Sequence, residues 1–186
     1  MDKLYFALVD TPGLFAAVIR KVIKQNYIHV AIAMDENLEN TYTVGRRHPF
    51  IPWFAGFTRE RSEQILLKFP NARYRIIAIE CEKEQKENIR RELEYCYKQR
   101  FQYHYNIIGL PFILLNRPFY QKNHYTCSSF IAKLMYMHGM ELFDKHFSLV
   151  TPRDFNELPD VQVLYEGRLA DYVGCDYQGE GELVEA

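Results

Sequence analysis

A cysteine followed by two serines opens the most constraining segment of the chain, residues 125–135. The apolar side chains after it recur at the spacing of one helix face: Phe130, Ile131, Leu134 and Met135. Cys127 is therefore expected at or just before the first turn of a helix. Unpaired N–H groups and the helix dipole favour an anion there and lower the pKa of a thiol. The alternative is a buried structural cysteine, with Ser128 as an ordinary helix cap.

A histidine begins the first strand of a predicted β-hairpin. Residues 29–34 and 41–46 read as the two strands, and the polar residues 35–40 as the turn between them. Imidazole is the usual base for a thiol at neutral pH, so His29 and Cys127 form a candidate base and nucleophile. His124 is a rival base, but its place three residues before Cys127 makes an awkward approach.

The order of these motifs resembles a known family. A histidine strand precedes a Cys-Ser-Ser-Phe helix in the circularly permuted branch of the NlpC-type papain-like cysteine hydrolases, which includes lecithin:retinol acyltransferase-like proteins and several bacterial amidases and peptidases. The segments that carry the resemblance are 29–32, 42–46, 105–109 and 127–130, within residues 27–140. The resemblance implies an α+β, papain-like fold. In such a fold an antiparallel sheet packs against helices, and the nucleophilic cysteine lies at a helix N-terminus.

The resembling families place a third polar residue, often histidine or glutamate, on the strand after the histidine strand. If the hairpin turn centres near Asn37, residues in the low-to-mid forties lie opposite His29, and Thr43 is the nearest polar candidate. Glu39 is a carboxylate but sits too near the turn tip. A one-residue slip would move Thr43 to the other face of the sheet, which leaves a backbone carbonyl or a water as alternatives.

These features predict a thiol hydrolase that cleaves an amide, peptide or ester bond through an acyl-enzyme on Cys127, with His29 as base. Backbone N–H groups at Cys127 and Ser128 would hold the oxyanion. An acyltransferase of the same fold would use the same intermediate. An alternative from another class is a catalytically inactive module that binds a peptide or lipid in an aromatic groove. The substrate class stays open between peptide, amide and lipid-like molecules, and the oligomeric state is open too.

Composition narrows the class of protein further. The 186 residues fit one domain, 1–186, and its acidic C-terminal tail, 177–186, is expected to be frayed. A net charge of −1 without a basic block argues against nucleic-acid binding. The chain has no CxxC pair, which would suggest a zinc or redox site, and neither a metal nor a cofactor is expected. No signal peptide or transmembrane stretch is recognisable, which predicts a cytoplasmic protein with reduced thiols.

The remaining elements are predicted from periodicity and breakers. The expected strands are 3–9, 63–69, 73–81 and 161–167; the expected helices are 14–26, 82–103 and a short apolar one within 105–115. Residues 46–57 are predicted to form an aromatic and proline-rich loop, packed on the core or serving as a substrate wall. Cys81 and Cys96 are predicted to be structural.

Overall fold

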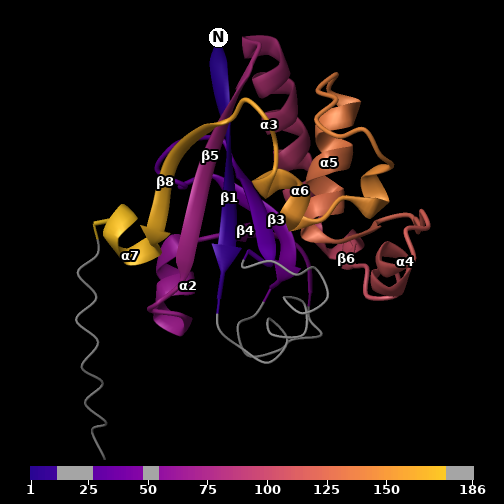
Figure 1. The fold of residues 1–186 in the computed structure, drawn as a ribbon, viewed down its shortest axis with the longest axis horizontal. Coiled ribbons are helices and arrows are strands. Elements are labelled where there is room, and N and C mark those ends of the chain that lie inside the picture. Colours follow the sequence, from indigo (N-terminus) through magenta and orange to yellow (C-terminus); the bar gives the residue numbers. More distant parts are fainter. Residues whose placement is uncertain (12–26, 48–54, 175–186) are drawn as a thin grey trace, which may run out of the picture.

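The structure, a computed structural model, describes residues 1–11, 27–47 and 55–174. The predicted helix 14–26, most of the predicted loop 46–57 and the acidic tail 177–186 lie outside the described residues. Six strands form one antiparallel sheet in the order β4-β3-β2-β1-β5-β8 (Figure 1). Their bounds are β1 Asp2–Asp10, β2 His29–Ala33, β3 Thr41–Arg46, β4 Ala55–Glu60, β5 Arg73–Cys81 and β8 Gln162–Arg168.

Strand β1 lies in the middle of the sheet, where it pairs with β5 over its whole length, Asp2–Asp10, and with β2 from Tyr5 to Val9. Leu4, Phe6 and Leu8 point into the larger of two apolar cores, whereas Ala7 and Val9 point into the smaller one. Both faces of the strand are therefore buried, and the apolar run of β1 is continuous rather than alternating. The protein is a mixed α+β structure built on an antiparallel sheet.

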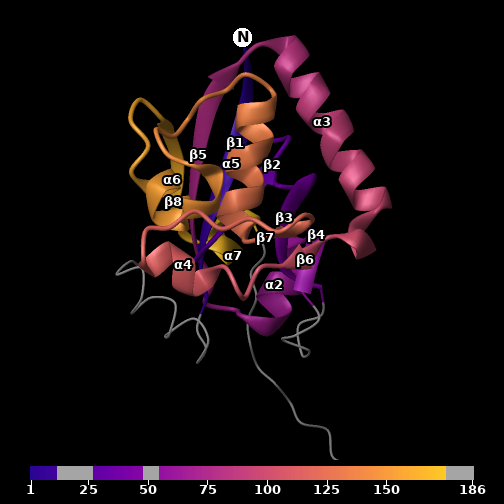
Figure 2. The same ribbon diagram turned by 90° about the vertical axis from the view of Figure 1, so that its right-hand side faces the viewer.

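Helices cover both faces of this sheet (Figures 1 and 2). The larger core contains the buried side chains of α3 (Lys83–Lys98), α5 (Cys127–Met137) and α6 (Pro152–Asn156). The smaller core contains those of α2 (Ser62–Lys68) and α7 (Leu169–Tyr172). None of the helices in the described ranges is long and apolar enough to cross a bilayer.

Helix α5 begins at Cys127 because Thr126 caps it. The Thr126 hydroxyl accepts the Ser129 N–H at 3.2 Å, and the Ser129 hydroxyl accepts the Thr126 N–H at 2.8 Å. This reciprocal pair is a capping box, so the cap is Thr126 and not Ser128, which the structural-cysteine alternative had as the cap. The Ser128 hydroxyl instead donates to the Val150 carbonyl at 2.6 Å. The first turn of α5 is thus fixed on two sides.

Two short parallel strands lead into α5. β6 (His104–Tyr105) pairs with β7 (His124–Tyr125), and the Asn106 N–H donates to the Tyr125 carbonyl at 3.0 Å. Between them lies α4 (Leu110–Leu114), which begins with Pro111 in its first turn. The remaining short elements are the 3₁₀ turns η1 (Arg100–Gln102) and η2 (Phe147–Leu149).

Some sequence predictions of secondary structure are confirmed and others are wrong. The strands 3–9, 73–81 and 161–167 appear as β1, β5 and β8. The predicted strand 63–69 is instead helix α2, since Ile65, Leu66 and Phe69 follow helical spacing and only Leu66 of the helix is buried. The end of the predicted loop 46–57 is also wrong, because residues 55–57 belong to β4.

Candidate active site

The structure brings Cys127 and His29 together. Cys127 is the first residue of α5, His29 is the first residue of β2, and α5 packs against β2 and β3. The imidazole of His29 is hydrogen-bonded to the sulfur of Cys127. Cys127 is 3% exposed, whereas the His29 side chain is 23% exposed. The pair therefore has a buried sulfur and a ring that reaches the surface.

An opening between β2 and β3 makes room for this contact. The two strands pair only at Ile32 with Tyr42 and at Ala33 with Thr41, whereas β3 pairs with β4 over its whole length. The pairing of β2 with β3 does not continue toward His29, and the N–H of Val30 hydrogen-bonds to the sulfur of Cys127 instead. The cysteine thus occupies backbone hydrogen-bonding capacity that a continued ladder would have used.

A glutamate holds the other side of the histidine. The Nε2 atom of His29 lies 3.0 Å from Oε2 of Glu60, the last residue of β4. The hydroxyl of Tyr74, a β5 residue that is 2% exposed, donates to Oε1 of Glu60 at 3.1 Å. Both carboxylate oxygens are engaged and the Glu60 side chain is only 11% exposed. A continuous hydrogen-bonded chain runs from Cys127 through His29 and Glu60 to Tyr74.

Thr43 does not occupy the place predicted for it. Its hydroxyl donates to the Val30 carbonyl at 2.8 Å, in the opening between β2 and β3, and its side chain is almost fully buried. Among the described residues, the side-chain oxygen that lies beside Nε2 of His29 belongs to Glu60. The hydroxyl of Thr43 instead satisfies a carbonyl that the interrupted ladder leaves without a strand partner.

Sequence reasoning missed Glu60 because β4 was hidden. Residues 55–57 read as the end of an aromatic loop and residues 63–69 as a strand, so Glu60 had no element of its own. The sequence offered little signal there, since residues 57–60, Phe-Thr-Arg-Glu, place one apolar residue before three polar ones and show no strand alternation. Pairing of β4 with β3, which places Glu60 across from Thr41, is what fixes its carboxylate.

Gly45 leaves space for the ring of His29, because glycine has no side chain. A Cβ atom on Gly45 would lie 3.3 Å from Cε1 and 3.8 Å from Nε2 of His29. The β2–β3 register, continued toward this end, puts Gly45 opposite His29. The corresponding space at Gly56, its partner on β4, is filled by the side chain of Arg47. Gly45 thus leaves room for the ring, whose Nε2 lies beside Oε2 of Glu60.

The charges of the site support a thiolate–imidazolium pair. Burial alone would raise the pKa of Cys127, but the positive charge and hydrogen bond of His29 lower it, helped by the N–H groups of Val30 and Ser128. Burial alone would lower the pKa of His29, but the thiolate of Cys127 and the carboxylate of Glu60 raise it. Both shifts favour the charged forms, so the pair stabilises a nucleophilic thiolate.

Further donors surround the sulfur. The Thr126 hydroxyl accepts the N–H of Ser129. The N–H groups of Cys127 and Ser128 lie in the first turn, where no earlier carbonyl of the helix can accept them. The phenol of Tyr105, from β6, is close enough for the charge of Cys127, together with burial, to raise its pKa. It therefore stays protonated at neutral pH and keeps its hydrogen for donation.

The other candidates lie elsewhere. The rival base His124 has its Nδ1 2.9 Å from the Lys122 carbonyl, and its ring packs 5.0 Å from that of His104. Cys81 and Cys96 are buried, and burial raises the pKa of both. In the described part of the chain the three cysteines are unpaired, and no group of three or more His, Cys, Asp or Glu residues could hold a metal ion.

Comparisons of the chain with protein-family models, with curated proteins and with solved structures found no match. The resemblance to NlpC-type hydrolases thus stays a prediction from the chain's own motifs, and the function is inferred from the geometry around Cys127.

Proposed function

We propose that this protein is a thiol hydrolase that cleaves an amide, peptide or ester bond through an acyl-enzyme on Cys127. The observation that carries the proposal is the hydrogen-bonded chain from Cys127 through His29 to Glu60. A nucleophile, a base and a group that orients the base are what acyl transfer by a thiol needs. The proposal includes a papain-like fold of the permuted NlpC type, with the nucleophile at a helix N-terminus and the base on a neighbouring strand.

The reaction begins with attack of the Cys127 thiolate on the carbonyl carbon of the substrate. As the C–S bond forms, the carbonyl π electrons move to oxygen, and N–H groups at Cys127 and Ser128 stabilise the resulting oxyanion. The imidazolium of His29 then donates its proton to the leaving amine or alcohol, and the C–N or C–O bond breaks. Glu60 keeps the ring oriented throughout and stabilises its positive charge.

Deacylation reverses these roles. Neutral His29 removes a proton from water, the hydroxide attacks the thioester carbonyl, and the Cys127 thiolate leaves with the electrons of the C–S bond. An acyltransferase would use an acceptor alcohol or amine in place of that water, with the same residues. The peptide, amide or lipid-like nature of the substrate remains part of the proposal, as does action in the cytoplasm, where Cys127 would stay reduced.

The inactive-module alternative would be favoured if His29 had no acidic or histidine partner, and β3, the strand after the histidine strand, contains neither residue type. Glu60 supplies a carboxylate to His29 from β4 instead, at 3.0 Å. A partly buried imidazole held between a carboxylate and a thiol is costly to maintain unless its charges are paired, and such perturbed groups cluster at functional sites. The arrangement around His29 therefore favours an active enzyme over a silent binding module.

The test is site-resolved alkylation of the full-length protein. Iodoacetamide at about pH 6.5, well below the ordinary thiol pKa, should label Cys127 at a rate at least tenfold above that of Cys81 or Cys96, as peptide mapping by mass spectrometry would show. Incubation with activated acyl esters should leave a transient acyl adduct on Cys127. Labelling of Cys127 no faster than that of Cys96, with no adduct from any acyl probe, would refute the proposal.

A further inference from the structure

One long segment of this chain contains no acidic residue. From Tyr95 to Met140 there is neither aspartate nor glutamate, although the whole chain has 24 of them and a net charge of −1. The same segment contains several lysines and arginines: Lys98, Arg100, Arg117, Lys122 and Lys133. The total charge is near zero because acidic residues elsewhere in the chain balance the basic residues of this segment.

The acid-free segment also exposes most of the large apolar side chains found on the surface. Among the described residues, twelve large hydrophobic side chains are exposed and nine of them lie between Tyr95 and Met140. Four aliphatic ones flank the ends of helix α4: Ile107 at 61%, Ile108 at 65%, Leu114 at 59% and Leu115 at 67% exposed. We call these four residues the α4 patch. Isolated exposed leucines are ordinary, but four around one helical turn indicate a contact surface.

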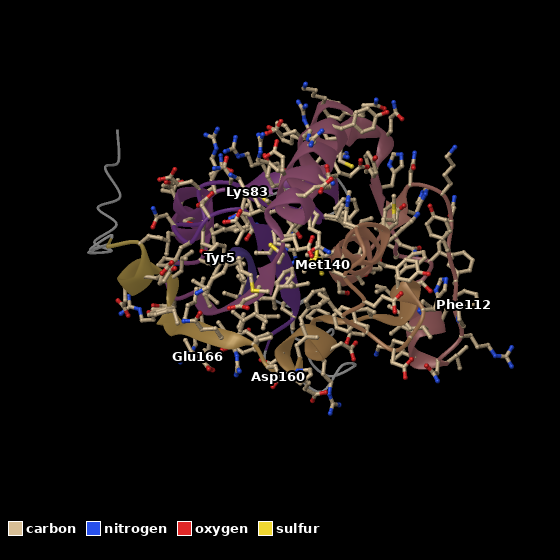
Figure 3. All side chains as sticks on the ribbon, turned by 90° about the horizontal axis from the view of Figure 1, so that it is seen from above. Tyr5, Lys83, Phe112, Met140, Asp160 and Glu166 are labelled. Carbon is tan, nitrogen blue, oxygen red and sulfur yellow. The ribbon has the colours of Figure 1, made fainter. Side chains whose placement is uncertain are left out.

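Packing and hydrogen bonding attach helix α4, around which the α4 patch lies, to the rest of the protein. Inside α4, the ring of Phe112 stacks on that of Phe119 with 4.6 Å between centroids, and the Phe119 N–H donates to the Ser148 hydroxyl at 3.2 Å. These contacts hold α4 to the rest of the protein while the α4 patch stays exposed. Figure 3 shows Phe112 at the outer edge of the molecule, and α4 lies on the opposite side from α7 in Figure 1.

The α4 patch is close to the Cys127 end of α5. The Asn106 side chain accepts the Gly109 N–H at 2.9 Å, and the Asn106 N–H donates to the carbonyl of Tyr125, two residues before Cys127. In Figure 2, α4, β6 and β7 lie together below α5. A surface that docks through α4 would therefore be near the candidate active site.

We propose that the α4 patch docks this protein onto an anionic phospholipid bilayer. The aliphatic side chains would enter the boundary between headgroups and acyl chains, while exposed Arg117 and Lys122, which follow α4, meet the lipid phosphates. Absence of acidic residues from the whole segment removes the repulsion that an anionic surface would otherwise meet. This proposal does not depend on the hydrolase function.

Charge also decides against a second copy of the chain as the occupant. A two-fold interface through the α4 patch would set Arg117 and Lys122 of one copy against the same cations of the other, with no acidic residue of the segment to pair with them. A bilayer that contains anionic lipid supplies both the apolar phase and the counter-charge. It thus fits the two properties of this surface together.

Vesicle flotation of the full-length protein tests the proposal. The protein should float with vesicles of phosphatidylcholine and phosphatidylglycerol, and much less with phosphatidylcholine alone. The double variant Leu114→Ser/Leu115→Ser and the double variant Arg117→Gln/Lys122→Gln should each lower the partition coefficient by on the order of tenfold. Leu67→Ser is the matched control, because Leu67 is 68% exposed on α2, away from α4.

The wild-type protein failing to float with anionic vesicles would overturn the proposal, as would equal losses in the Leu67→Ser control. Binding that ignores the anionic lipid would also overturn it. Sedimentation velocity adds the other occupant as an outcome: self-association that the α4 patch variants abolish, with vesicle binding unchanged, would assign the surface to a second copy instead. Circular dichroism and Cys127 alkylation verify that each variant is folded.

Discussion

Cys96 and Cys127 are both buried on the apolar face of a helix, at 2% and 3% exposure, yet their thiols differ in chemistry. Cys96 lies near the end of α3, with its sulfur 3.2 Å from the Tyr103 hydroxyl and 3.8 Å from a Glu92 carboxylate oxygen. Burial raises the pKa of Cys96 to about 11. Cys127 opens α5 beside His29, and its pKa is lowered. Burial alone therefore does not determine the state of a cysteine here.

The difference comes from what faces each sulfur. Around Cys96 the nearby charge is negative, and the last turn of a helix presents carbonyl oxygens. Around Cys127 the neighbours are an imidazole, two backbone N–H groups and the positive end of a helix dipole. Each of these stabilises an anion, and together they outweigh the desolvation that both sulfurs share.

The largest effect that this comparison predicts is on turnover. Cys127→Ala removes the nucleophile and should lower acyl-ester hydrolysis by roughly 10⁴-fold or more, since residues that act as a unit fail together. Cys96→Ala should keep turnover within about twofold and lower only the stability, by about 1 kcal/mol, because it removes a packed thiol. Steady-state kinetics and thermal unfolding measure the two quantities. A Cys96→Ala protein that loses turnover while staying folded would break the comparison.

The second prediction concerns the pH dependence of alkylation. In the wild type, the midpoint for Cys127 should lie below the ordinary thiol value of about 8.5, because the charge on His29 favours the thiolate. His29→Ala removes that charge and leaves the desolvation, so the midpoint should rise above the ordinary value. Alkylation of Cys96 should be slow and equal in both proteins. An unchanged Cys127 midpoint would show that the helix terminus, rather than the imidazole, lowers its pKa.

The third prediction compares Glu60 with Thr43. Glu60→Gln keeps a hydrogen-bonding side chain on His29 but removes its charge, so the Cys127 midpoint should rise by about one pKa unit, less than in His29→Ala. Thr43→Val removes the hydroxyl that bonds Val30 and should lower the free energy of unfolding by about 1 kcal/mol without moving the midpoint. Glu166→Gln is the exposed control. A larger midpoint shift in Thr43→Val than in Glu60→Gln would return the third position to Thr43.

How much of this could be predicted from sequence depends on the range of the interaction. Cys127 and His29 were found because local signals mark both: a serine-rich helix start for one and the first residue of a strand for the other. The strands β1, β5 and β8 and the helices α3 and α5 were found for the same reason, within a few residues of their ends.

Glu60 and α2 depend on contacts that sequence patterns do not show. Glu60 reaches His29 only because β4 pairs with β3, because β2 and β3 part toward His29, and because Gly45 leaves space for the ring. In α2 the run Ile65, Leu66, Leu67 reads as a strand, but Leu66 is buried and Leu67 is 68% exposed, which follows from packing on one side of the sheet. The sheet order, with β1 at its centre, is likewise set by pairings between distant segments.

The smallest predicted effect belongs to Tyr74, the far end of the hydrogen-bonded chain. Tyr74→Phe keeps the buried ring and removes only the hydroxyl that donates to Glu60. Glu60 loses a fixed donor on one oxygen and gains freedom to rotate away from His29, so kcat should fall a few-fold while KM stays unchanged. The Cys127 alkylation midpoint should move in the same direction as in Glu60→Gln but by less.

Tyr27→Phe separates this positioning role from a general loss of packing. The Tyr27 hydroxyl also donates to a glutamate, Glu166, at 2.8 Å, but that carboxylate pairs with Arg75 and is not part of the chain to Cys127. Both variants should lower the free energy of unfolding by about 2 kcal/mol, since each removes one hydrogen bond to a charged group. Only Tyr74→Phe should move kcat and the alkylation midpoint. If both variants change kcat equally, Tyr74 acts through stability, and the chain that distinguishes Cys127 from Cys96 ends at Glu60.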